Sequence, residues 1–112
     1  LARTYFKNVN GNNADRFDQA ARYADAKEWE KATSIWEKIA SSRTDADAAG
    51  KATYNLAVAA EVRGQLNLAL QFAKDAYTQY GLKNAKSYIR ILEDRMADQE
   101  LLNRQMHEKA KS

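Results

Sequence analysis

The chain has 112 residues and a formal net charge of +3, from 18 basic and 15 acidic side chains. It contains twenty-one alanines, no proline and no cysteine, and His107 is its one histidine. The missing cysteine excludes disulfides and thiolate chemistry, and a single histidine excludes a histidine-pair metal site or a catalytic triad within one chain. Many helix-forming residues and no helix breaker predict an all-α fold.

Several further functions are disfavoured by the distribution of charge and apolar residues. Both signs of charge are mixed along the sequence, so we expect no basic face for nucleic acid. No apolar run approaches the roughly 20 residues that span a bilayer, so we expect no membrane insertion by this segment. No set of titratable residues indicates a pocket, so we expect no enzymatic activity, cofactor or metal. The chain does not begin with Met, and we expect it to be a fragment of a longer precursor.

Apolar residues recur at spacings of three and four, which predicts helices in a single helical domain of residues 1–112. Residues 1–13 form an N-terminal extension that ends in the turn signal Asn10-Gly11-Asn12-Asn13. A first hairpin follows at 14–40, with helices over 14–25 and 29–40. A second hairpin follows at 46–80, with helices over 46–63 and 65–80, and a long capping helix follows at 83–107, which we expect to fray beyond Leu102.

Polar residues and glycines mark the ends of these helices. Asn12 or Asn13 is placed to cap the first helix, and Thr44 or Asp45 is placed to cap the third. Gly64 and Gly81 follow the third and fourth helices, where glycine commonly closes a helix. The loops are therefore short, and successive helices are expected to be antiparallel neighbours.

The two hairpins also resemble each other when the chain is shifted by 37 residues. The shift superposes these pairs: Ala20 on Ala57, Lys27 on Gly64, Trp29 on Leu66, Ala32 on Ala69, Trp36 on Ala73 and Ile39 on Ala76. Small residues at such positions let helices approach closely, and bulky neighbours fill the space beside them. In these residues the sequence resembles the tetratricopeptide repeat family, whose unit is about 34 residues of helix, turn and helix. The closing proline of that family is absent, and Ala73 replaces an aromatic residue.

The tetratricopeptide resemblance implies two antiparallel hairpins in an α-α superhelix that binds a peptide or protein segment on its concave face. The first helix of each hairpin lines that face, which also brings Asp25 towards it. The implied partner-binding residues are Phe17, Lys51, Tyr54, Asn55, Val58, Glu61, Tyr88 and Arg95. Among them Phe17, Tyr54 and Tyr88 are expected to form an aromatic ladder.

A second resemblance is carried by the paired tryptophans, the run from Lys51 to Glu61, and Tyr88-Ile89 with Leu92 and Arg95. These features look like the C-terminal repeat region of envelope lipoproteins from Bacteroides-type bacteria. That resemblance implies a lipid anchor upstream of Leu1 and a periplasmic or outer-membrane setting.

Two functions stay open at this point. The first is a non-enzymatic module that binds a protein, a peptide or another domain of its own chain, and the second is a structural scaffold with no groove ligand. An open apolar groove would favour binding, whereas a groove filled by residues 1–13 or by the last helix would favour the structural role. The same aromatics at helical spacing are also typical of ordinary core packing. The last helix, through Met96 and Met106, offers a surface for weak self-association.

Overall fold

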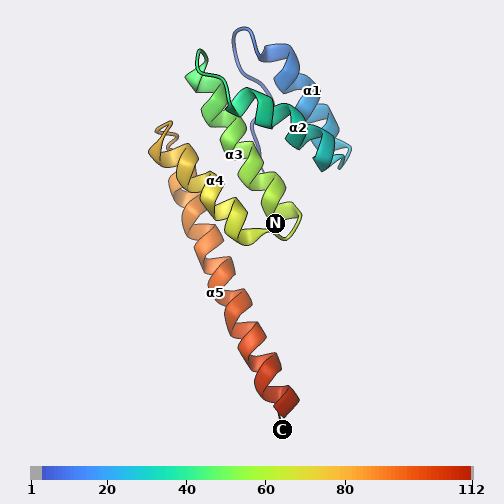
Figure 1. Cartoon of the computed structure of the whole chain (residues 1–112), viewed down its shortest axis with the longest axis vertical. Coiled ribbons are helices and arrows are strands. Elements are labelled where there is room, and N and C mark those ends of the chain that lie inside the picture. The colour runs from blue at the N-terminus through green and yellow to red at the C-terminus, as the bar shows by residue number, and fades with distance from the viewer. Residues whose placement is uncertain (1–3, 112) are drawn as a thin grey trace.

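The computed structural model describes residues 4–111 and contains five α-helices and no strand within that range. The helices are α1 (Ala14–Asp25), α2 (Trp29–Ala40), α3 (Ala46–Val62), α4 (Leu66–Thr78) and α5 (Asn84–Lys111) (Figure 1). The all-α prediction is therefore confirmed for the described residues.

The helix boundaries follow the apolar periodicity closely, except at the C-terminal end. The bounds of α1 and α2 are those predicted, and α3 and α4 each end within two residues of the predicted position. By contrast α5 remains helical to Lys111, so the expected fraying beyond Leu102 is wrong for this structure. No glycine or proline interrupts this stretch, and Glu100 pairs with Arg104 one turn later at 3.8 Å.

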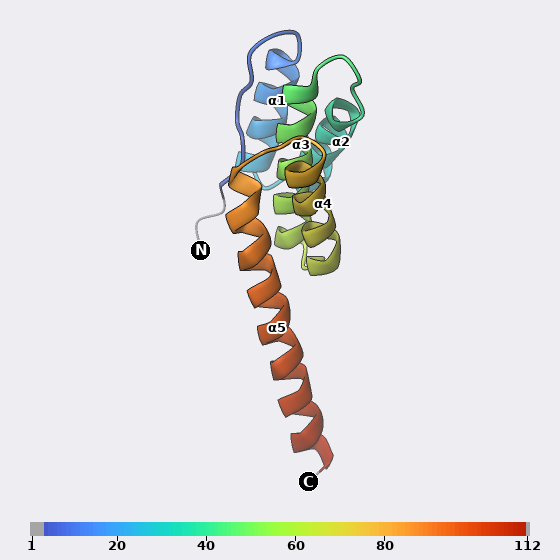
Figure 2. The same ribbon diagram turned by 90° about the vertical axis from the view of Figure 1, so that its left-hand side faces the viewer.

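The other four helices are arranged around α3. Figure 2 shows α2 and α4 on one side and α1 and α5 on the other, with α3 between them. Each helix packs chiefly on the next one in the chain, from α1 on α2 to α4 on α5. The second half of α5 extends beyond the other helices, which gives the molecule its long dimension of 59 Å.

The central position of α3 explains its composition. Thirteen of its residues are buried, whereas α1 buries only the four residues of one face. A helix that is covered on most sides cannot be amphipathic, and alanine allows its neighbours to approach closely. The few large or polar residues of α3 include Tyr54, Asn55 and Glu61, and all three are buried.

The turns inside the two hairpins repeat the same geometry 37 residues apart. Lys27 has a φ of 64° and Gly64 a φ of 78°, so each adopts the left-handed conformation that closes a helix. The helix-closing hydrogen bonds are equivalent too: Glu28 N–H to Tyr23 O at 2.8 Å, and Gln65 N–H to Ala60 O at 2.9 Å. The backbone therefore repeats even where a lysine stands in place of a glycine.

One of the two predicted caps forms as expected. The side chain of Asp45 accepts a hydrogen bond from the Ala48 N–H at 3.1 Å and caps α3. Asn13 is the residue before α1, but its side chain does not cap that helix. Its amide instead donates to Asp45 at 2.8 Å, so the starts of α1 and α3 are joined.

Candidate functional site

Residues 4–13, which we call the strap, lie along the face formed by α1, α3 and α5. In Figures 1 and 2 the strap runs back from the start of α1 towards the opposite end of the helical bundle. It has no regular secondary structure, yet its side chains contact residues of α1, α2 and α3. This face is therefore occupied by the protein's own chain.

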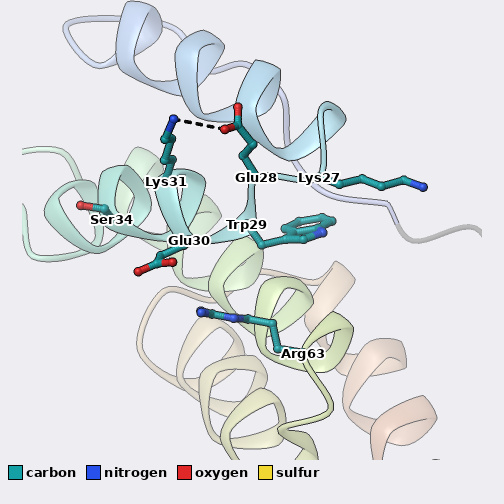
Figure 3. Close-up of a pocket in the computed structure, with 7 residues that line it drawn as sticks. All are labelled: Lys27, Glu28, Trp29, Glu30, Lys31, Ser34 and Arg63. Atoms are coloured by element: carbon teal, nitrogen blue, oxygen red, sulfur yellow. Dashed lines mark ion pairs between the residues drawn. The ribbon is translucent and has the colours of Figure 1, made fainter.

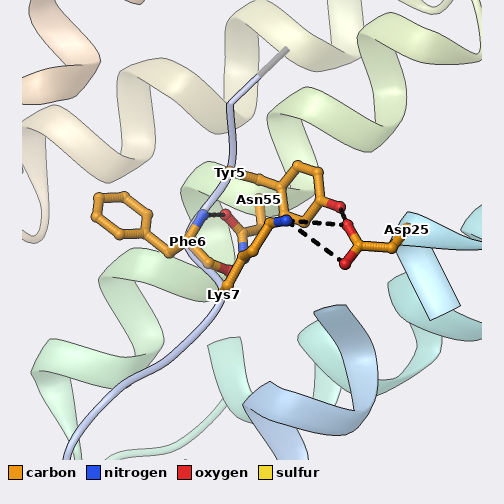
Figure 4. A network of polar contacts seen from close by, with 5 residues as sticks. All are labelled: Tyr5, Phe6, Lys7, Asp25 and Asn55. Atoms are coloured by element: carbon orange, nitrogen blue, oxygen red, sulfur yellow. Dashed lines mark hydrogen bonds and ion pairs between the residues drawn. The ribbon is translucent and has the colours of Figure 1, made fainter. Parts of the chain in front are cut away.

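The side chain of Asn55 binds the main chain of the strap (Figure 4). The Phe6 N–H donates to Asn55 Oδ1 at 2.7 Å, and Asn55 Nδ2 donates to the Phe6 carbonyl at 2.7 Å. The Asn55 side chain is fully buried in the middle of α3, where an unsatisfied amide would cost about 1–3 kcal/mol. The paired bonds satisfy it, and they need an extended peptide at this position.

Tyr5 fits an aromatic site beside this contact. Its ring centroid lies 5.8 Å from that of Trp29 and 5.9 Å from that of Trp36, and its hydroxyl donates to Asp25 at the end of α1. Burial, and then the hydrogen bond to Asp25, raise the pKa of Tyr5 to about 12. The ring is thus fixed by α2 and the hydroxyl by α1.

Asp25 joins Tyr5 to a second strap residue. The Lys7 ammonium lies 3.2 Å from one Asp25 oxygen, and both side chains are largely exposed. The hydrogen bonds from Tyr5 and Lys7 hold the pKa of Asp25 below its usual value. An exposed ion pair of this kind contributes little to stability.

The Phe6 side chain points away from Tyr5 and packs on α3. Its ring meets Tyr54 edge to face at 5.3 Å, and the Lys51 ammonium lies 5.6 Å from its centroid. Farther along the strap, Val9 is 6% exposed and belongs to the same core as Phe17 and Trp36. Successive strap residues therefore contact different helices, as expected for an extended chain.

The expected aromatic ladder forms only in part. Tyr54 and Tyr88 are neighbours with ring centroids 5.2 Å apart, but Phe17 is fully buried in the core between α1 and its neighbours. The prediction that Phe17 lines the groove is therefore wrong, because its side of α1 packs inward. Phe6 of the strap takes the third place on the other side of Tyr54.

Glu61 and Arg95 form a separate polar cluster at the far end of this face. Glu61 is 6% exposed, accepts a hydrogen bond from Tyr88 at 2.7 Å and pairs with Arg95. The cluster joins α3 to α5 and lies partly inside the fold. Val58 is also buried, whereas Lys51 and Arg95 keep a quarter of their side chains exposed.

A shallow hollow lies on another surface, at the turn between α1 and α2 (Figure 3). It encloses about 730 Å³ and is lined by Lys27, Glu28, Trp29, Glu30, Lys31, Ser34 and Arg63. Lys31 pairs with Glu28 at 3.1 Å across its edge. Apart from the half-buried Trp29, its side chains are exposed and of mixed charge, so it provides no converging set of polar groups for a small molecule.

The strap itself was the part of the site that the sequence did not indicate. Asp25, Lys51, Tyr54 and Asn55 were expected at the groove, but residues 1–13 were expected only as an extension that could fill it. The signal available in the sequence was an asparagine in the middle of an alanine-rich helix. If such a helix is buried, the asparagine side chain requires a polar partner. No local pattern identifies a partner 49 residues away.

Two further kinds of site are absent from residues 4–111. No helix in this range is both long enough and apolar enough to cross a membrane. No group of three or more histidine, cysteine or acidic side chains within the same range is arranged to hold a metal ion.

Comparison with known proteins gives one match. Residues 18–94 match the family described as Domain of unknown function (DUF6340), which spans α2 to α4 completely and parts of α1 and α5. No curated protein and no solved structure matches the chain. Since the match covers more than half of the sequence, the chain belongs to the DUF6340 family.

Proposed function

We propose that this domain is a non-enzymatic helical-repeat scaffold that holds an extended peptide segment, its own strap, along the α1–α3–α5 face. The observation that carries the proposal is the paired hydrogen bonding of Asn55 to the Phe6 main chain. Side-chain packing alone would be satisfied by an apolar residue in α3. A buried amide that binds a peptide main chain is instead typical of a site that holds an extended segment.

The sequence left two functions open, a binding module and a structural scaffold, and the proposed function combines elements of both. The face is filled, which favours the structural role, and it is filled by a bound segment, which favours recognition within the chain. The tetratricopeptide and lipoprotein resemblances agree with a scaffold but remain predictions. So do the absence of catalysis and of nucleic-acid binding.

Limited proteolysis tests the proposal. Trypsin can cleave after Lys7 only when the strap leaves the face, because the bond lies next to the residue held by Asn55. We expect Asn55→Ala to speed this cleavage by about tenfold or more, since 1.4 kcal/mol of lost restraint corresponds to a factor of about ten. Asn67→Ala, at an exposed asparagine of α4, is the matched control and should leave the rate unchanged.

The outcome that would reject the proposal is equally clear. If native protein and Asn55→Ala are cleaved after Lys7 at the same rate while both remain fully helical, Asn55 does not hold the strap. The face would then be an ordinary packing surface.

A further inference from the structure

The strap residues occupy a set of side-chain sites that differ in chemistry. Tyr5 lies against two tryptophans with its hydroxyl on Asp25, and Lys7 pairs with the same carboxylate. Phe6 lies on Tyr54 beneath Lys51. In sequence order these sites select an aromatic residue with a hydroxyl, a second aromatic residue and a base.

Asn55 adds binding energy without adding sequence requirements. It contacts only the main chain of Phe6, so any extended residue except proline could make the same two hydrogen bonds in that place. Affinity and selectivity are thus divided between different residues of the face. That division suits a receptor for a linear segment, whereas a permanent core contact gains nothing from it.

The strap is attached to the bundle in a way that permits its release. Lys7 and Asn8 are exposed, and the turn that leads into α1 is exposed at Asn10, Gly11 and Asn12. Gly11 has a φ of 97°, so the chain reverses there at a residue that tolerates several conformations. The helices pack chiefly on their neighbours in sequence, so opening of residues 4–9 breaks the strap's own contacts, including the core contact of Val9, and not the contacts between helices.

We infer that the α1–α3–α5 face binds an extended segment of a partner protein carrying an aromatic hydroxyl, a second aromatic and a base in succession, and that the strap occupies this site until it is displaced. The inference rests on the proposed function. The acidic Asp25 at one end, the two tryptophans and the main-chain contact of Asn55 define the chemistry of that partner.

The test uses the full chain and a blocked synthetic peptide with the sequence of residues 4–10. A strap variant, Tyr5→Ser with Phe6→Ser and Lys7→Ser, removes the three side chains from their sites. The single change Lys7→Glu removes only the exposed ion pair with Asp25 and should loosen the strap less. Binding is followed by titration calorimetry and by the emission of Trp29 and Trp36. Circular dichroism checks that each variant keeps its helices.

We expect the strap variant to bind the peptide about tenfold or more tighter than the native chain, because a tethered strap competes at an effective concentration on the order of millimolar. The single Lys7→Glu change should give a smaller gain in the same direction. A peptide with glutamate in place of its lysine should bind the strap variant about two- to fivefold more weakly, because the glutamate meets Asp25 at an exposed site. Adding Asn55→Ala to the strap variant should weaken its binding of the original peptide by about tenfold.

Three results would overturn the inference. The first is no binding by a folded strap variant or by folded Lys7→Glu, and the second is equal binding of the glutamate peptide. The third is a dimer of the native chain with exchanged straps that excludes the peptide, which would assign the face to a second copy. If Asn55→Ala releases the strap but no peptide binds, only this inference fails; if Asn55→Ala leaves strap cleavage unchanged, the proposed function fails first.

Discussion

The strap and the last four turns of α5 are both terminal segments, and they are held in opposite ways. Residues 4–9 lack regular secondary structure but contact three helices through their rings, main chain and an ion pair. Residues 97–110 are regularly helical, yet each of their side chains is exposed. Regular backbone structure therefore does not show which terminal segment is integrated into this domain. The contacts show it, and they identify the strap as the integrated segment.

The largest expected effect comes from removing Trp36, on which the Tyr5 ring packs. Trp36 is fully buried and lies beneath Tyr5, so Trp36→Ala should lower the free energy of unfolding by about 3–5 kcal/mol and loosen the strap. Chemical denaturation measures the loss. Trp36→Phe is the comparison, because it keeps an aromatic ring and should cost only about 1 kcal/mol. Equal losses for the two variants would mean that the ring does not support the strap.

A smaller effect is expected from the main-chain contact alone. Asn55→Ala should lower the free energy of unfolding by about 2 kcal/mol, because two hydrogen bonds to Phe6 are lost together. Asn67→Ala on α4 should change it by less than about 0.5 kcal/mol. The prediction fails if the two asparagine variants unfold at the same denaturant concentration.

High pH should weaken the strap through Tyr5. The pKa of its hydroxyl is raised from 10.0 to about 12, so the neutral form is favoured in the folded state. That contribution is complete below the unfolded pKa and is lost as pH rises from about 10 towards 12. Native protein should therefore melt above Tyr5→Phe at about pH 9, and the gap should narrow as pH rises above about 10 and close near about pH 12. A gap independent of pH would show that the hydroxyl does not bind Asp25.

The smallest effect is expected at the other terminus. Leu101 and Met106 are 52% and 61% exposed, so the double change Leu101→Ser with Met106→Ser should shift the free energy of unfolding by less than about 0.5 kcal/mol. Sedimentation over a range of concentrations shows whether this segment pairs between molecules. A mass that rises with concentration in the native chain and not in the variant would show a weak self-association through α5. A constant monomer mass would argue against it.

The sequence predicts the helices well because their signals are local. Apolar spacing and the glycines at 64 and 81 place the ends of the helices, and the 37-residue shift anticipates the repeated turns at Lys27 and Gly64. The Asp45 cap of α3 was predictable because its hydrogen-bond donor, the Ala48 N–H, is only three residues away. The prediction of a last helix over 83–107 that frays beyond Leu102 rests on the polarity of this stretch, but no residue in it breaks a helix and α5 continues to Lys111.

The site is less predictable because its contacts are distant in sequence. Asn55 was expected to face a partner, but Phe6 lies 49 residues away, and only the packing of α3 brings them together. Phe17 was expected to line the groove because it occupies the position in its helix that Tyr54 occupies in α3. An equivalent helix position does not fix which way a side chain faces, and Phe17 packs into the core. Helix periodicity identifies a buried face, whereas the identity of the covering segment depends on tertiary structure.

Amide exchange at Phe6 tests the central claim most directly. Its N–H donates to the buried Asn55 side chain, so nuclear magnetic resonance should show slow exchange in the native chain. In Asn55→Ala the same amide should exchange at the rate of an unprotected peptide, while the amides of α3 and α4 stay protected. Rapid exchange of the Phe6 amide in the native protein, or equal protection in both proteins, would contradict a strap held by Asn55.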